Sequence, residues 1–119
     1  MSTHKVLIVE DDDAFLPLIK LALRDFDFDI DVANGGNSAL GKILENEYEL
    51  VISDYRLPEV HGLDILKAAK QRNQECKAVL ITAANADMLN TELKNINLLG
   101  FIQKPLSPME LRRLVSIAF

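Results

Sequence analysis

The sequence predicts an α/β protein with one parallel sheet and helices on both of its faces, a doubly wound (βα)5 sandwich. Apolar runs of strand length alternate with segments of helical period from one end of the chain to the other. The runs are almost continuously apolar, which is typical of parallel strands buried on both faces. Right-handed crossovers between successive strands then distribute the helices over the two faces.

The first part of the chain supplies two strands and one helix. The run "KVLIV" predicts a strand at 5–9, and six apolar residues at helical spacing predict a helix over 14–26. Pro17 falls in the first turn of that helix, where proline is tolerated best. The segment 29–33 alternates like a more exposed strand, and "NGG" at 34–36 is a turn.

The middle of the chain continues the alternation. We expect a short helix at 37–47 and a buried strand at 49–54, "ELVISD". A loop at 55–62 leads to a helix at 63–72, and "KAVLITA" is the next strand, at 77–83.

The last part of the chain completes five βα units. It contains an expected helix at 86–95, a short strand at 100–103 and a final helix at 107–118. Ser107 is the expected N-cap of that helix, with Pro108 at its first position.

Length and composition favour one domain that spans residues 1–119. The chain has 119 residues, a common size for a single domain, and 49% hydrophobic residues supply a full core. It shows no internal repeat and no linker. The net charge of −5 argues against direct nucleic-acid binding and fits a protein that handles a cation or meets a basic partner.

Cysteine usage and hydropathy indicate a cytoplasmic protein without a membrane segment. The only cysteine, Cys76, excludes an intramolecular disulfide and suits a reducing compartment. No signal peptide precedes the first strand, and no apolar run approaches the length that a bilayer span requires.

Polar residues gather where the predicted strands end. Glu10 and Asp11 follow the first strand, Asp54 ends the third, Thr82 lies at the end of the fourth, and Lys104 follows the fifth. The carboxyl ends of parallel strands share one edge of the sheet, which is where such folds bind ligands. The sequence therefore predicts one site at this edge.

The residue types at this edge suit phosphoryl chemistry. Converging carboxylates suit a hard divalent cation, either Mg²⁺ or Mn²⁺ as its substitute. The cation would also relieve the mutual repulsion of the carboxylates. A lysine and a hydroxyl suit a phosphoryl group. A carboxylate beside such a cation can be the nucleophile and form an aspartyl phosphate, for which positioning and charge neutralisation are the main requirements.

The chain resembles the receiver domain of two-component response regulators. The resemblance lies in "VLIVEDDD", "VISDYRLPEVHG", "VLITAA" and "FIQKPL", in this order and spacing, and covers essentially the whole chain. It implies the flavodoxin-like fold with strand order 2-1-3-4-5. It also implies a signalling switch of a phosphorelay that changes its partner-binding surface when phosphorylated. Such a domain is not an enzyme in the usual sense, although Mg²⁺-dependent self-phosphorylation from a phosphodonor and slow self-dephosphorylation are expected.

The resemblance implies roles for individual residues around the acceptor. Asp54 would take the phosphoryl group from a sensor histidine kinase or a histidine phosphotransfer protein. Asp11 would bind Mg²⁺ directly and Glu10 through water, with Asp54 and the main-chain carbonyl of Arg56 as further ligands. Many members have two aspartates where this chain has Glu10 and Asp11.

The remaining family positions concern the switch and the lifetime of the phosphoryl group. Thr82 would hydrogen-bond that group and Lys104 would pair with its charge, before a cis peptide at Pro105. Phe101 occupies the place of the switch aromatic, with simple core packing as the competing interpretation. Two further residues, Arg56 and Ala84, occupy the lifetime-tuning positions and predict slow self-dephosphorylation.

The resemblance also implies partners. The face formed by 86–118 would meet the output partner or effector domain. The domain would be a monomer or a phosphorylation-dependent homodimer through the fourth and fifth helices. We expect no effector domain within this chain. The chain is either a stand-alone receiver or, as its end soon after the last helix favours, a piece of a longer regulator.

Other functions and roles compete with this interpretation. A degenerate receiver would act only as a phosphorylation-independent protein-binding module. A phosphohydrolase of the haloacid-dehalogenase type needs the Asp-x-Asp pattern that Asp11 to Asp13 contain, but also a cap for which this chain has no room. A flavodoxin-like FMN carrier would have its phosphate repelled by these carboxylates. Asp12 and Asp13 also suit the N-cap and first turn of the following helix.

Overall fold

The sheet has the predicted architecture. In a computed structural model, which describes residues 3–83 and 96–119, five parallel strands lie in the order β2-β1-β3-β4-β5. The fold class and strand order expected from the sequence are therefore confirmed. The strands are β1 (His4–Val9), β2 (Phe28–Ala33), β3 (Leu50–Asp54), β4 (Lys77–Thr82) and β5 (Gly100–Gln103).

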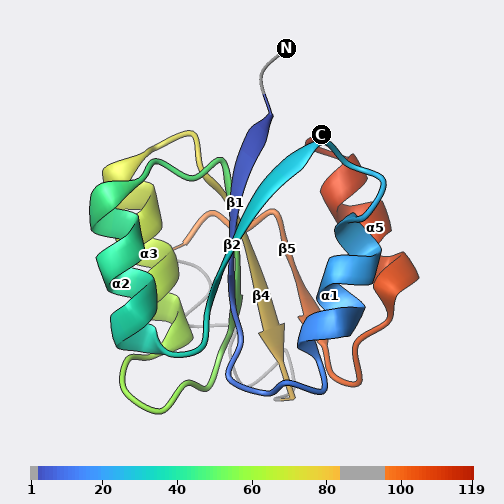
Figure 1. Cartoon of the computed structure of the whole chain (residues 1–119), viewed down its shortest axis with the longest axis horizontal. Helices are drawn as coiled ribbons and strands as arrows, with labels where there is room; N and C mark the ends of the chain where they lie inside the picture. Colours follow the sequence, from blue (N-terminus) through green and yellow to red (C-terminus); the bar gives the residue numbers. More distant parts are fainter. Residues whose placement is uncertain (1–2, 84–95) are drawn as a thin grey trace.

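Helices cover both faces of the sheet. In Figure 1, α1 and α5 lie on one side of the strands and α2 and α3 on the other. The expected helix at 86–95 and Ala84 lie outside the described residues. No described helix is long and apolar enough to cross a membrane. The described helices are α1 (Leu16–Leu23), α2 (Gly36–Glu45), α3 (Gly62–Arg72) and α5 (Pro108–Ser116).

Two apolar layers hold the helices to the sheet. Because side chains alternate along a strand, neighbours on β1 pack in opposite directions. Leu7 belongs to the layer beneath α2 and α3, and Ile8 to the layer beneath α1 and α5. Both are fully buried, and all five residues of β3 are buried. The central strands are thus buried on both faces, as their continuous apolar runs predict.

The first helix is shorter than the predicted 14–26. Asp12 Oδ1 accepts a hydrogen bond from the Ala14 N–H (2.9 Å), and the Asp12 carbonyl accepts one from the Phe15 N–H (3.1 Å). This turn uses the residues that precede α1, so the helix begins at Leu16. The expected N-cap and first-turn roles of Asp12 and Asp13 are wrong, since Phe15 holds the N-cap position without a side-chain bond and no acid lies in the first turn.

The end of the chain follows the prediction closely. Ser107 Oγ accepts a hydrogen bond from the Glu110 N–H (3.3 Å), and Pro108 is the first residue of α5. The Lys104–Pro105 peptide bond is cis. Helix α5 packs against α1 on one face of the sheet.

Candidate functional site

The predicted polar residues meet at the carboxyl edge of the sheet, at the bottom of Figure 1. Glu10 is 2% exposed, Asp54 is 7% exposed and Thr82 is 1% exposed. Asp11 beside them is exposed. Burying a charged group costs free energy unless a partner of opposite charge or a hydrogen bond compensates it. The partners of these side chains therefore matter for the chemistry of this edge.

Lys104 joins two of these carboxylates. Its Nζ lies 3.0 Å from Asp54 Oδ2 and 3.5 Å from Glu10 Oε1, and its side chain is 14% exposed. The Lys104 backbone N–H donates to the Thr82 carbonyl (2.7 Å), which anchors the lysine beside the end of β4. Burial lowers the pKa of the Lys104 ammonium, but the hydrogen bond and charge of Asp54, together with Glu10, raise it overall.

Three carboxylates form a set that could hold a metal ion. Glu10, Asp11 and Asp54 each offer an oxygen, and these oxygens lie within 4.8 Å of one another. Glu10 Oε2 is buried and has no hydrogen-bond partner among the described residues. An unpartnered buried carboxylate oxygen in an acidic cluster fits a hard divalent cation, which takes oxygen ligands. The donor set therefore suits Mg²⁺ or Mn²⁺ chemically.

The same surroundings perturb Glu10. Burial, and then the charge of Asp54, raise the pKa of the Glu10 carboxyl from 4.5 to about 7. Because the folded pKa lies above the ordinary value, folding favours the protonated carboxyl. This contribution to stability is complete below pH 4.5 and is lost as the pH rises toward 7.

We therefore predict that the metal-free domain becomes less stable between about pH 4.5 and pH 7, by on the order of 2 kcal/mol from Glu10. Glu10→Gln removes this decline, because the amide does not titrate. Urea unfolding in EDTA across this pH range measures the effect, with the exposed Glu75→Gln as the matched control. Equal pH slopes for wild type and Glu10→Gln would contradict the prediction.

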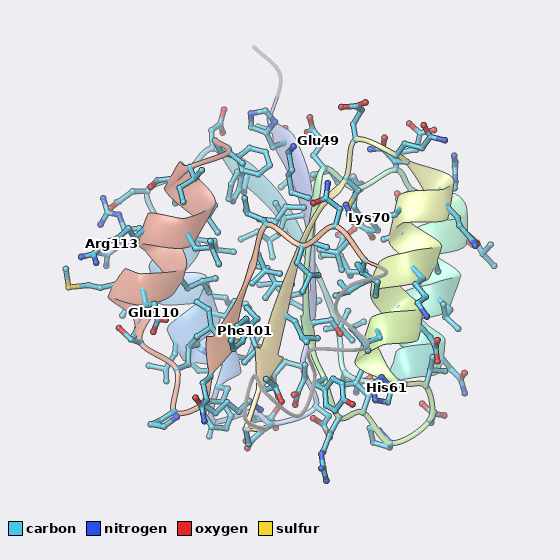
Figure 2. All side chains as sticks on the ribbon, turned by 180° about the vertical axis from the view of Figure 1, so that it is seen from behind. Glu49, His61, Lys70, Phe101, Glu110 and Arg113 are labelled. Atoms are coloured by element: carbon cyan, nitrogen blue, oxygen red, sulfur yellow. The ribbon has the colours of Figure 1, made fainter. Side chains whose placement is uncertain are left out.

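The loop after β3 keeps its main chain close to the Asp54 carboxylate. The Arg56 N–H donates to Asp54 Oδ1 (3.4 Å), and the Gly62 N–H donates to the Tyr55 carbonyl (3.0 Å). His61 Nδ1 accepts from the Leu63 N–H (3.2 Å) and so caps α3. Figure 2 shows His61 at this edge, well away from Glu49 at the opposite one.

The remaining predicted residues differ in their surroundings. The Arg56 side chain is exposed to solvent and is not part of the core. Phe101 on β5 is partly buried and packs against the core layer beneath α2 and α3, and Figure 2 labels it at that strand. The geometry thus places Phe101 between core and surface.

One residue at this site was missed from the sequence. Phe15 was predicted only as part of the apolar face of the first helix, yet the Lys104 Nζ lies over its ring, 4.2 Å from the centroid. The signal that could have found it is the "DDDAF" stretch before Pro17, in which an aspartate turn precedes a proline-started helix.

Comparison with known proteins decides the family. The family model described as the response regulator receiver domain matches residues 6–116. The chain belongs to this family. Receiver domains of response regulators are signalling switches of two-component systems and are usually not classical enzymes. The resemblance found in the sequence is confirmed.

Individual receiver-containing proteins agree in sequence and fold. The response regulator ArlR of Staphylococcus saprophyticus is 38% identical over 79 residues, 66% of this chain and 36% of that protein. A CheY-like receiver domain from Methanospirillum hungatei superposes with a TM-score of 0.87 at 25% identity, covering 98% of this chain and 94% of that one. The signal receiver domain of a putative Luxo repressor from Vibrio parahaemolyticus superposes with a TM-score of 0.86 at 27% identity. The superposition covers 98% of this chain and 89% of that one.

The match concerns the receiver part of longer proteins. The Escherichia coli transcriptional regulatory protein ZraR is 29% identical over 101 residues, which are 85% of this chain but 23% of that regulator. The chain therefore spans about a third or less of these two curated relatives. Response regulators in general receive phosphoryl groups from histidine kinases and act through output domains.

Proposed function

We propose that this receiver domain accepts a phosphoryl group on Asp54 from a histidine kinase or a histidine phosphotransfer protein, in a Mg²⁺-dependent reaction. The observation that carries the proposal is the Lys104 ammonium, 3.0 Å from Asp54 Oδ2 at the edge where the acidic cluster lies. A carboxylate oxygen of Asp54 attacks phosphorus, and the P–N bond to the donor imidazole breaks. The imidazole nitrogen keeps the electron pair and takes up a proton.

Each neighbouring residue has a role in this proposal. Lys104 balances the charge of the phosphoryl group, and the Thr82 hydroxyl donates a hydrogen bond to it. Glu10, Asp11 and Asp54, with the Arg56 carbonyl, would hold Mg²⁺. The cation, when bound, neutralises the acidic cluster and the oxygens of the phosphoryl group.

The test uses acetyl phosphate as the phosphodonor and intact mass as the readout. We expect a single phosphoryl adduct that requires Mg²⁺, is lost in EDTA and is absent from Asp54→Asn. The matched control is Asp64→Asn, which removes an exposed aspartate of α3 and leaves the adduct intact. Failure of the wild-type domain to form an adduct would favour the degenerate receiver, a binding module that does not depend on phosphorylation.

Phosphorylation of Asp54 would change the surface of the domain. Charge added at Asp54 biases Thr82 and Phe101 between two arrangements, which alters the surface of β5 and α5. The output partner or effector domain would read this change, and homodimerisation through the same region would be its other outcome. We place this activity in the cytoplasm, with 1–119 as one receiver unit.

The lifetime of the adduct is part of the same proposal. The exposed Arg56 guanidinium can cover a phosphoryl group on Asp54, and Ala84 has no polar group with which to position water. We expect self-dephosphorylation to be slow. An adduct that decays within seconds in the isolated domain would contradict these two roles.

A further inference from the structure

The acidic run after β1 contains a turn as well as candidate metal ligands. The Asp12 N–H donates to Glu10 Oε1 (3.1 Å), so the chain folds back over the buried glutamate. Asp12 Oδ1 then accepts from the Ala14 N–H, and the Asp12 carbonyl accepts from the Phe15 N–H. These three bonds deliver Phe15 to the start of α1, at the rim of the site.

The ring of Phe15 and the carboxylates hold the same ammonium group. Lys104 Nζ lies 4.2 Å from the ring centroid, within cation–π distance, while it also contacts Asp54 Oδ2 and Glu10 Oε1. A lysine ammonium is a point charge on a flexible four-carbon stem, so its position depends on such contacts. The aromatic face and Asp54 together restrict where the charge of Lys104 can lie.

We propose that Phe15 is a positioning residue that holds the Lys104 ammonium at Asp54, and that Asp12 places Phe15 there through its turn. This rests on the proposed function, because the ammonium matters only where charge develops on a transferring phosphoryl group. Phosphoryl transfer depends on positioned charge. Loss of the ring therefore slows the formation of the P–O bond to Asp54 without removing the acceptor.

The kinetic test measures phosphorylation of the full chain by acetyl phosphate and Mg²⁺. We expect Phe15→Leu to lower the rate about three- to tenfold, which matches the usual strength of a cation–π contact. Phe15→Tyr keeps an aromatic face and should restore the rate. Phe26→Leu is the matched control, because Phe26 is also a partly buried phenylalanine but stacks on Phe28, away from Lys104. This variant should leave the phosphorylation rate unchanged.

A second pair of variants tests the turn. Asp12→Asn and Asp12→Ala remove the same charge, but asparagine also supports the side-chain turn and alanine does not. We expect Asp12→Ala to lower the phosphorylation rate toward that of Phe15→Leu, and Asp12→Asn to keep a rate near that of the wild type. Equal rates for these two variants would overturn the role given to Asp12.

A structural readout separates this inference from the proposed function. A proton above an aromatic face is shifted upfield, so the ε-methylene protons of Lys104 should resonate upfield of those of the other lysines. The shift should disappear in Phe15→Leu and persist in Phe15→Tyr. No shift in the wild type, or a wild-type rate in Phe15→Leu, would overturn the positioning role. The expected upfield shift in a wild-type domain that forms no phosphoryl adduct would support the contact between Lys104 and Phe15 and would overturn the proposed function instead.

Discussion

Replacement of Lys104 by methionine is expected to slow phosphorylation of Asp54 about a hundredfold or more, the usual effect of removing one group that stabilises developing charge. Methionine has a similar length but no charge, so the ammonium 3.0 Å from Asp54 Oδ2 is lost while the stem remains. Rates of adduct formation with acetyl phosphate and Mg²⁺ measure the effect. Lys67→Met, an exposed lysine on α3, changes the net charge equally and should leave the rate near wild type.

The same variant should also destabilise the metal-free domain. Without the ammonium, the buried carboxylates of Glu10 and Asp54 face each other without a cation, which costs roughly 3 kcal/mol near pH 8. The cost should be smaller at pH 5, because Glu10, with a pKa of about 7, is then protonated. Urea unfolding in EDTA at both pH values gives the comparison. An equal loss at pH 5 and pH 8, or a rate within threefold of wild type, would contradict this account.

Gly62→Ala should cause the second large effect, a loss of about 3 kcal/mol in the free energy of unfolding. A Cβ added at Gly62 would lie 2.0 Å from the Asp54 carbonyl oxygen and 2.9 Å from the Tyr55 Cα. These are backbone atoms next to the buried strand β3, and the Ser53 hydroxyl donates to the same carbonyl (3.0 Å). The chain must shift to make room, and that shift displaces Asp54.

The phosphorylation rate should therefore fall about tenfold or more in Gly62→Ala, since small misplacements of reacting groups are costly. Gly41→Ala is a control of opposite sign. Among the described residues, no atom beyond the chain neighbours and the helix's own backbone lies within 4 Å of a Cβ added at this exposed position of α2. Alanine should therefore stabilise the helix by about 0.5–1 kcal/mol. Urea unfolding of both variants tests this. Stability of Gly62→Ala within about 0.5 kcal/mol of wild type would contradict it.

Other details of the molecule depend on contacts that no local pattern encodes. Tyr48 follows α2 in a stretch rich in glutamate, yet it is 2% exposed and donates to Asp31 Oδ2 (2.7 Å). Asn73 Nδ2 also donates to the Tyr48 carbonyl (3.0 Å). These partners come from β2 and from the end of α3, so the burial of Tyr48 follows from how the elements pack.

The boundaries of α1 show a similar limit. Helical periodicity begins at residue 14, where apolar spacing starts, but Ala14 and Phe15 lie in a turn whose N–H groups bond to Asp12. At the start of α1, the Ile19 N–H donates to the Phe15 carbonyl (3.1 Å). The competition between a side-chain turn and a helix is decided by local geometry and by the proline that follows. Periodicity alone therefore predicts the existence of α1 and overestimates its length.

The amino-acid sequence was enough to predict the fold class, the strand order through the family resemblance, and the edge at which the polar residues gather. It could do so because continuous apolar runs identify strands buried on both faces, and parallel strands bring their carboxyl ends together. The packing of the elements, in contrast, brings Lys104 to Asp54, Glu10 and Phe15, and it buries Glu10 Oε2 without a hydrogen-bond partner among the described residues. These are contacts between residues far apart in the chain, and they depend on side-chain distances that spacing along the sequence does not contain.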